Sequence, residues 1–462
     1  MLAQYTVDVG GRIAAFMDAF GVPGVAVLVT LAVAIIAFQF VRGTGLSLLL
    51  LITSYSLIFV ESSGVNTAAF FVRSLALVTL VLSLARRFVV PGWAFWGMFL
   101  YAMLGLACGT RAPNVWWSLQ TGGLLVVTTV ALTIGLSGYL RSLRQVDALF
   151  RMFVVAGVIW CMASMVFASD FISGRQLRFG GGSSLHATNY AASGALLFPF
   201  MLWAALQKGR WLWRVVGVGG MAVMLLCLFL SGTRTGFVVL ALACAPLMLG
   251  RGVGGMLRLG AVLGVVGVLL LFGGARLLQG RSTDFLVARL TSVSLSGRSR
   301  LWSTALDVCL ESPVIGRGIG SHNPLAGQVG ISDFHNAYLS IWCNAGAIGL
   351  LLVLSVMAVY SVRAFQLIHR TGHPLAKDAV RLSLGFIVAI GARGFVESSF
   401  ASPSNASIAT LLIALTMISA IHRFSLQQRT GPAIAPRRAP ATRTETARFA
   451  PHSTLMTRSA PR

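Results

Sequence analysis

Long runs of apolar residues follow one another along most of the chain, and short polar segments separate them. A run of roughly 18–21 residues is long enough to cross, as a helix, a hydrocarbon core of about 30 Å. Backbone groups in lipid must be hydrogen-bonded internally, so these runs predict helices, whereas barrel strands would alternate apolar and polar residues. About thirteen runs meet this length criterion, at residues 22–41, 45–60, 67–85, 92–108, 118–138, 151–170, 187–206, 212–230, 235–250, 256–274, 336–362, 381–397 and 404–421.

The composition supports a membrane protein. Hydrophobic residues make up 56% of the 462 residues and charged residues only 10%, whereas a soluble domain carries about 25% charged residues. The sequence therefore predicts an all-α, polytopic integral membrane protein with about 12–13 transmembrane helices.

The basic residues predict an orientation in the membrane. The formal net charge is +24, and basic clusters recur in alternate short loops, which the positive-inside rule places in the cytoplasm. These clusters are Arg86 with Arg87, Arg141 with Arg144 and Arg151, Lys208 with Arg210 and Arg214, Arg251 with Arg258, and Arg363 with Arg370, Lys377 and Arg381. The charge is spread between spans rather than gathered on one domain, so nucleic-acid binding is not expected.

The same rule places the other loops outside and the C-terminus inside. We expect an N-terminal segment at 1–20, a transmembrane domain at 21–424 that contains a long outer loop at 275–334, and a tail at 425–462. The tail is rich in proline and arginine and predicts disordered chain that touches anionic lipid. Inside the outer loop, apolar residues recur at helical spacing over 300–311, which predicts an amphipathic helix on the bilayer surface or over a cavity.

Several arginines belong to the loops expected outside, against the positive-inside pattern. Any one of these arginines could simply extend its side chain from the membrane interface to the lipid headgroups. Together they suggest phosphate binding, because guanidinium groups hold phosphate oxygens bidentately and stay charged. They are Arg178, Arg234 in a Ser-Gly-Thr-Arg corner, Arg298 and Arg300.

His335 begins the segment His335-Asn336-Ala337-Tyr338-Leu339 at the start of an apolar span. One interpretation is a histidine that is satisfied at the membrane interface. The other is a proton acceptor, because imidazole titrates near neutral pH. Asp333 would orient the ring or cap the following helix, and the sequence does not separate these roles.

Two further groupings stay open. Arg393 and Glu397 are four residues apart on one helix face, so we expect them to pair, in either a functional or a structural role. The six cysteines are scattered without metal-ligand spacing, so we expect neither a metal site nor a disulfide framework, although a Cys309–Cys343 bridge remains an option.

The residues from about 178 to 350 resemble the bacterial O-antigen ligase and O-antigen polymerase family. The resemblance rests on Arg298-Ser299-Arg300-Leu301-Trp302, then Ala305, Pro313, Gly316, Gly318 and Gly320, then His335-Asn336-x-Tyr338-Leu339, then Gly346 and Gly349. Arg178 with Asn189, and the corner at Arg234, look like two upstream arginine regions of the family.

The resemblance implies a helical fold similar to the lipid-dependent glycosyltransferases of the C class. It implies transfer of a glycan from undecaprenyl diphosphate to an acceptor hydroxyl, without metal or other cofactor, on the periplasmic face of the inner membrane. His335 would act as the general base or hold the acceptor, and Arg234 with Arg298 or Arg300 would stabilise the diphosphate. Arg178, Asn189, Asn336 and Tyr338 would bind substrate. The absence of any Asp-x-Asp pair also favours a donor that needs no divalent metal.

The acceptor stays undecided at this level. A ligase would pass finished polysaccharide to a lipid A core sugar, and a polymerase would extend one lipid-linked glycan, such as an exopolysaccharide, with another. A transporter or flippase of lipid-linked saccharides would place charges near the bilayer midplane. A scaffold without chemistry would tolerate the loss of His335.

Overall fold

The computed structural model describes residues 45–57, 63–83, 89–172, 184–207, 209–254, 298–319, 334–398 and 405–430, together with residues 257, 260 and 401. These residues form helices joined by short turns, and none of them is in a strand. The expected span at 22–41, the segment 1–20 and most of the expected span at 256–274 lie outside the described residues, as does Glu61.

The helices follow the apolar runs closely. In chain order they are α2 (Gly45–Leu57), α3 (Ser63–Ser83), α4 (Trp93–Cys108), η3 (Gly109–Arg111), α5 (Val115–Val130), η4 (Ala131–Gly135), α6 (Leu136–Tyr139), α7 (Leu143–Ile172), α8 (Ser184–Ala205), α9 (Trp211–Leu230), α10 (Arg234–Leu249), α13 (Arg298–Glu311), α15 (Ala337–Arg370), α16 (Pro374–Gly394) and α17 (Ala406–Thr430). Here η4 is a π-helical turn that joins α5 to α6. The last helix, α17, ends at Thr430, five residues beyond the expected start of the tail at 425.

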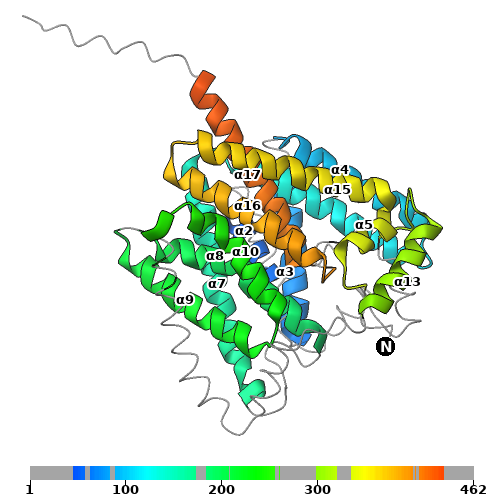
Figure 1. The fold of residues 1–462 in the computed structure, drawn as a ribbon, viewed down its shortest axis with the longest axis horizontal. Coiled ribbons are helices and arrows are strands. Elements are labelled where there is room, and N and C mark those ends of the chain that lie inside the picture. Colours follow the sequence, from blue (N-terminus) through cyan, green and yellow to red (C-terminus); the bar gives the residue numbers. More distant parts are fainter. Residues whose placement is uncertain are drawn as a thin grey trace, which may run out of the picture.

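Six stretches of the described chain are long and apolar enough to cross a membrane, at Trp93–Arg111, Val115–Tyr139, Leu143–Met165, Trp211–Leu230, Ala337–Arg370 and Ala406–Gln427. The prediction of an all-α, polytopic membrane protein is therefore confirmed. Figure 1 shows these helices as one bundle in which α4 and α15 run side by side and α13 lies at the edge beside α15.

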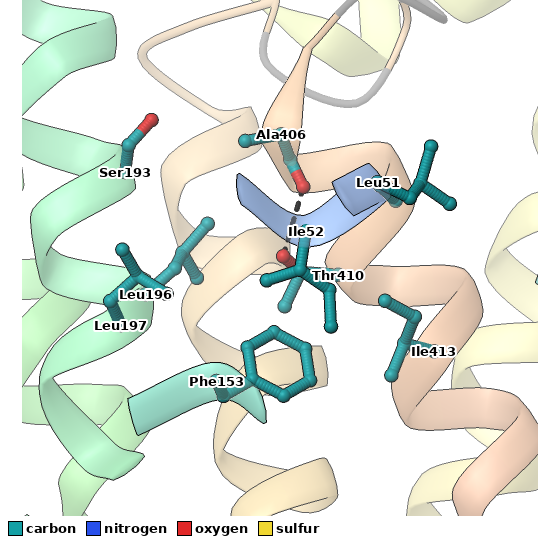
Figure 2. A pocket seen from close by; sticks show the side chains of 10 residues that line it. Leu51, Ile52, Phe153, Ser193, Leu196, Leu197, Ala406, Thr410 and Ile413 are labelled. Atoms are coloured by element: carbon teal, nitrogen blue, oxygen red, sulfur yellow. Dashed lines mark hydrogen bonds between the residues drawn. The ribbon is translucent and has the colours of Figure 1, made fainter. Parts of the chain in front are cut away.

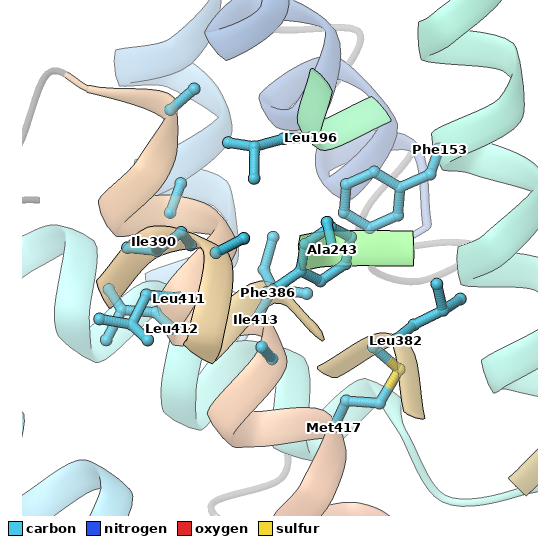
Figure 3. Packing of buried hydrophobic residues seen from close by; sticks show 14 of the residues in the cluster. Phe153, Leu196, Ala243, Leu382, Phe386, Ile390, Leu411, Leu412, Ile413 and Met417 are labelled. Atoms are coloured by element: carbon cyan, nitrogen blue, oxygen red, sulfur yellow. The ribbon is translucent and has the colours of Figure 1, made fainter. Parts of the chain in front are cut away.

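Helix α17 runs through the middle of the bundle (Figure 1) and is buried along most of its length. A helix that is apolar on all sides is stable only where other helices surround it. Its side chains pack against those of α8 and α16, and Figure 3 shows Leu411, Ile413 and Met417 of α17 with Phe386 and Ile390 of α16.

Helices α10 and α16 pack against each other in opposite directions. They approach closely at Gly385, where an added Cβ would lie 2.2 Å from the carbonyl oxygen of Ala243. One end of this pair carries an ion-pair cluster, in which Asp378 bonds Arg251 and has Arg381 at 3.8 Å. The other end carries Arg234 at the start of α10 and the residues that follow α16.

Helix α15 is broken near its start. Gly346 has φ 67° and ψ −175°, so the helix is interrupted there, and only glycine adopts this backbone conformation at low cost. The turn after α13 fits into the break: the amides of Arg317 and Gly318 donate to the carbonyls of Cys343 and Asn344, both at 2.8 Å. The amide of Ala347 donates in return to Pro313 O at 2.8 Å. The break therefore costs few hydrogen bonds, and it fixes the turn against α15.

Candidate functional site

The backbone at His335 has an uncommon conformation. His335 has φ 49°, and it is the one residue other than glycine with positive φ in the described part of the chain. For an L-residue this left-handed conformation costs roughly 1–2 kcal/mol, and such strain clusters at functional sites. Phe334, the residue before His335, is 1% exposed and lies in a small core under α13.

Asn336 caps α15 directly after His335. Its Oδ1 accepts hydrogen bonds from the amides of Tyr338 at 3.0 Å and Leu339 at 3.1 Å, which satisfies donors that the first helical turn leaves unpaired. Its Nδ2 donates to Phe395 O at 3.4 Å. Tyr338 donates its hydroxyl to Gly391 O at 2.7 Å. Both side chains, predicted to bind substrate, therefore tie the start of α15 to the end of α16 in this structure.

A buried carboxylate connects His335 to Arg298. Glu397 follows the end of α16, and its side chain is only 8% exposed. Its Oε2 lies 3.3 Å from His335 Nδ1, and its Oε1 lies 3.6 Å from an Nη of Arg298 on α13. The two basic side chains are more open than the acid, at 27% for His335 and 31% for Arg298. The arrangement thus turns two basic side chains toward the surface around a buried carboxylate.

The charge state of Glu397 follows from these neighbours. Burial by itself would raise its pKa, but the hydrogen bond with His335 and the charges of Arg393, His335 and Arg298 outweigh burial, so its pKa is lowered from the ordinary value of 4.5. Glu397 is therefore a carboxylate at neutral pH. A carboxylate on Nδ1 selects the tautomer in which Nε2 accepts protons.

The expected ion pair between Arg393 and Glu397 is not formed. Among the described residues, Glu397 has its ion pairs with His335 and Arg298, and Arg393 instead donates to Asn189 Oδ1 and Ser407 Oγ, both at 2.9 Å. The spacing of four residues predicts a shared face only while the helix continues, and α16 ends at Gly394 between the two. Arg393 is 2% exposed and joins α8, α16 and α17.

Asn189 and Arg234 lie at the same end of the bundle as His335. Asn189, predicted to bind substrate, accepts hydrogen bonds from Arg393 and, at 3.4 Å, from Asn405. Arg234 begins α10 and is half-buried. An added Cβ on the nearby Gly236 would lie 3.1 Å from Ala191, which places the start of α10 against the start of α8.

The remaining predicted site residues are described only in part. The side chain of Arg300 and all of Arg178 lie outside the described residues, as do Asp333 and the outer-loop segments 275–297 and 320–333. Of Arg298 and Arg300, Arg298 is therefore the one whose partner in the site is described, and that partner is the carboxylate of Glu397.

Helix α13 confirms the amphipathic helix expected at 300–311. It runs from Arg298 to Glu311. Leu301, Ala305, Val308 and Cys309 are buried, with Ala305 at 0%, and they face α15. The helix therefore packs on α15 at the edge of the bundle and brings Arg298 to Glu397.

The described residues contain no group of three or more histidine, cysteine and acidic side chains that could hold a metal ion. An apolar pocket lies deeper in the bundle, between α2, α7, α8 and α17 (Figure 2). Its lining includes Leu51, Phe153, Leu196 and Ile413, and its polar members are Ser193 and Thr410. It carries no charged group, so it is distinct from the charged site at His335.

The geometry at His335 coincides with a sequence match. Residues 219–354 match the family model described as O-antigen ligase. This segment is similar to the O-antigen ligase family. The match contains Arg234, Arg298, Arg300 and His335, and the resemblance found in the sequence is confirmed for this segment. No curated protein matches the chain in a sequence search.

The segment that matches the O-antigen ligase model ends within α15 and before Glu397. The sequence reasoning found Glu397 but assigned it the wrong partner. A usable signal was its rarity, because the chain has only 12 acidic residues and this one follows an apolar span. The contribution of Asn405 and Ser407, which join the hydrogen bonds around Arg393 and Asn189, was missed because neither is unusual in sequence.

Proposed function

We propose that this protein is a membrane glycosyltransferase that transfers a glycan from a polyprenyl diphosphate, of the undecaprenyl type, to an acceptor hydroxyl. The site would face the periplasm from the inner membrane of a bacterium. The observation that carries the proposal is the contact of one buried carboxylate, Glu397, with both His335 and Arg298. This contact joins a proton acceptor to a phosphate-binding group, and both His335 and Arg298 belong to the segment that matches the O-antigen ligase model.

In the proposed reaction, the acceptor hydroxyl attacks the anomeric carbon of the donor glycan. The hydroxyl proton passes to His335 as the new glycosidic bond forms, and the bond from the anomeric carbon to the diphosphate oxygen breaks. Glu397 stabilises the imidazolium that results and holds the ring in position. It is a positioning residue, because it acts through His335 and Arg298.

The diphosphate leaves with additional negative charge. Arg298, partly exposed at 31%, and Arg234 at the start of α10 would stabilise that charge, because guanidinium groups bind phosphate oxygens bidentately. Arg300 and Arg178 are further candidates for the same task. The reaction would need no metal, since protein cations neutralise the leaving group.

The acceptor distinguishes two forms of the proposal. In a ligase it is a sugar of the lipid A core, and in a polymerase it is the glycan on a second polyprenyl diphosphate. A transporter of lipid-linked saccharides has less support, because the arginine and histidine groups gather at one end of the bundle rather than at its middle.

The test is a transfer assay with purified protein. The protein receives a lipid-linked oligosaccharide, with and without a lipid A core acceptor. Core-dependent transfer would identify a ligase, and longer lipid-linked chains would identify a polymerase. No product in either assay, from protein that elutes as a single folded species, would overturn the proposal.

Two substitutions test the assigned roles in the same assay. His335→Ala and Arg234→Ala should each lower turnover by about 10²–10³-fold, the usual loss when a general base or an oxyanion-stabilising donor is removed. Arg144→Ala, which removes an exposed arginine at the start of α7, is the matched control and should keep wild-type turnover. Wild-type turnover in His335→Ala would remove the proposed base, and loss of turnover on adding a chelator would contradict the metal-free reaction.

A further inference from the structure

Two buried cysteines meet where α13 packs on α15. Cys309 and Cys343 are each 1% exposed, and both belong to a small cluster with Ala305, Val308 and Phe334. The Sγ of Cys309 donates to Leu339 O at 3.5 Å, and Leu339 lies one helical turn before Cys343. The Cys343 thiol lies beside the Cys309 thiol in this cluster and interacts with it. Residues that are 34 positions apart in sequence are therefore in side-chain contact.

The backbone holds this pair in register. The turn after α13 donates from the Arg317 amide to the carbonyl of Cys343 itself, at 2.8 Å. The indole Nε1 of Trp342 donates to Pro313 O, also at 2.8 Å. These bonds fix α13 against the first segment of α15, so the two sulfurs meet as a consequence of the fold rather than of side-chain mobility.

We propose that Cys309 and Cys343 form a disulfide bond that joins α13 to α15 in the mature protein. The proposal rests on the proposed function in one respect, the placement of this end of the bundle outside the cytoplasm, where disulfides persist. A disulfide needs two cysteines whose Cα atoms are within about 7 Å and whose side chains face each other. Thiols that meet in one buried cluster satisfy the second requirement and are compatible with the first.

The chemistry is an exchange with an external disulfide. One cysteine, as thiolate, attacks a sulfur of a thiol–disulfide oxidoreductase, which forms a mixed disulfide and releases one thiol of that oxidant. The second cysteine then attacks the mixed disulfide and releases the other thiol. The two cysteines lose two electrons and two protons, and the oxidant becomes a dithiol.

The local environment indicates a structural bond and not a reversible switch. The interaction with the Cys343 thiol, together with burial, raises the pKa of Cys309, so the docked thiol gives little of the reactive thiolate. The bond would therefore form before α13 is fully docked, and the apolar cluster would then shield it from reductants. Its consequence is a fixed α13, the helix that presents Arg298 to Glu397.

The test counts thiols in the full-length protein. Membranes from expressing cells are quenched in acid, and the protein is denatured and treated with a polyethylene-glycol maleimide, with and without prior reduction. The chain has six cysteines, so the reduced sample should carry six labels and the unreduced sample four. Six labels without reduction would overturn the proposal.

Variants identify which cysteines are bonded. Cys309→Ser should give five labels with or without reduction, since Cys343 then has no partner. Cys161 and Cys227 are the matched control, because they are also buried neighbours, but on α7 and α9. Cys161→Ser should give five labels after reduction and three before. A reduction-dependent count in Cys309→Ser would assign the bond to other cysteines and contradict the proposal. The counts do not depend on transferase activity, so loss of either proposal leaves the other testable.

Discussion

At the scale of single residues, Glu397 determines the electrostatics of the site. It is almost fully buried, yet it stays charged because His335 and Arg298 contact its two oxygens and Arg393 lies nearby. A buried charge of this kind is costly unless it is paired and hydrogen-bonded. The carboxylate in turn orients its partners, because it holds the imidazole of His335 and the guanidinium of Arg298 in one orientation each. The site would therefore lose its geometry if the negative charge were removed.

Glu397→Gln should lower turnover by about 10²-fold, the size of loss that misplaced reacting groups produce. The loss should fall on kcat more than on KM, and the acid limb of the pH–rate profile should move to lower pH, because the imidazolium loses its anionic neighbour. Glu311→Gln on α13 is the control, since Glu311 is 55% exposed and pairs with Arg317 near the surface. Equal losses in the two variants would show that Glu397 has no special role.

A fall in pH should break the contacts of Glu397 with His335 and Arg298. The pKa of Glu397 is lower in the folded protein than its ordinary value of 4.5, so its contribution to stability is complete above that value and is lost as the pH falls through the lowered pKa. Thermal unfolding of the purified protein, followed from about pH 6 to about pH 3, should show a loss of stability at the acid end. In Glu397→Gln this component should be absent; an identical acid dependence in both proteins would exclude Glu397 as its source.

At the scale of elements, the broken helix α15 builds the site. Its first segment begins at the Asn336 cap, next to the strained backbone of His335, and ends at the break at Gly346. The turn from α13 is bonded into that break, so α13 and the first segment of α15 form one unit. Arg298 and His335, at the beginnings of these two helices, are therefore held together by the packing of the elements that carry them.

The cap at Asn336 should affect both stability and turnover. Asn336→Ala should cost about 1 kcal/mol of stability, the usual price of a lost N-cap, and should also lower turnover because His335 is the preceding residue. Asn114→Ala provides a matched control, since Asn114 caps α5 through Trp117 N at 3.0 Å. It should cost a similar stability, measured by thermal unfolding, and leave turnover near the wild-type value. An equal turnover in the two variants would contradict the positioning role of Asn336.

At the scale of the whole molecule, the bundle has two chemically different ends. Asp378 with Arg251 and Arg381 marks one end of the α10–α16 pair, and Arg234 with Glu397 marks the other. The first end holds basic residues that the positive-inside rule assigns to the cytoplasm. The second end holds the site. It also holds the end of α4, where the Sγ of Cys108 donates a hydrogen bond to Ile315 O at 2.9 Å. This separation favours an orientation with the site outside.

Thiol labelling in whole cells tests that orientation. Thr110→Cys introduces an exposed thiol beside the end of α4, and Gly254→Cys introduces one beyond α10, where nothing lies within 4 Å. A membrane-impermeant maleimide should label Thr110→Cys in spheroplasts and should label Gly254→Cys only after lysis. The parent protein is the blank, because its six cysteines are buried. The reverse pattern would place the site in the cytoplasm and remove the proposed donor.

The pattern of apolar runs and motifs in the sequence was enough to predict the helices, their nature as membrane spans and most of the candidate residues. The physical reason is local: a bilayer requires long apolar helices, so hydropathy along the chain reports them directly. The motif around Arg298 and His335 was readable for a similar reason, because its residues are close in sequence or belong to a recognisable pattern.

Which of those residues contact one another became clear only from the packing of the helices. Glu397 contacts His335 across 62 positions in sequence, and Arg393 contacts Asn189 across 204, so both pairings depend on how α8, α15 and α16 pack. The spacing of Arg393 and Glu397 gave a wrong partner because α16 ends between them. The role of Gly346 emerged in the same way, since a break in a helix is tolerated only where another segment supplies its hydrogen bonds, and that segment is the turn after α13.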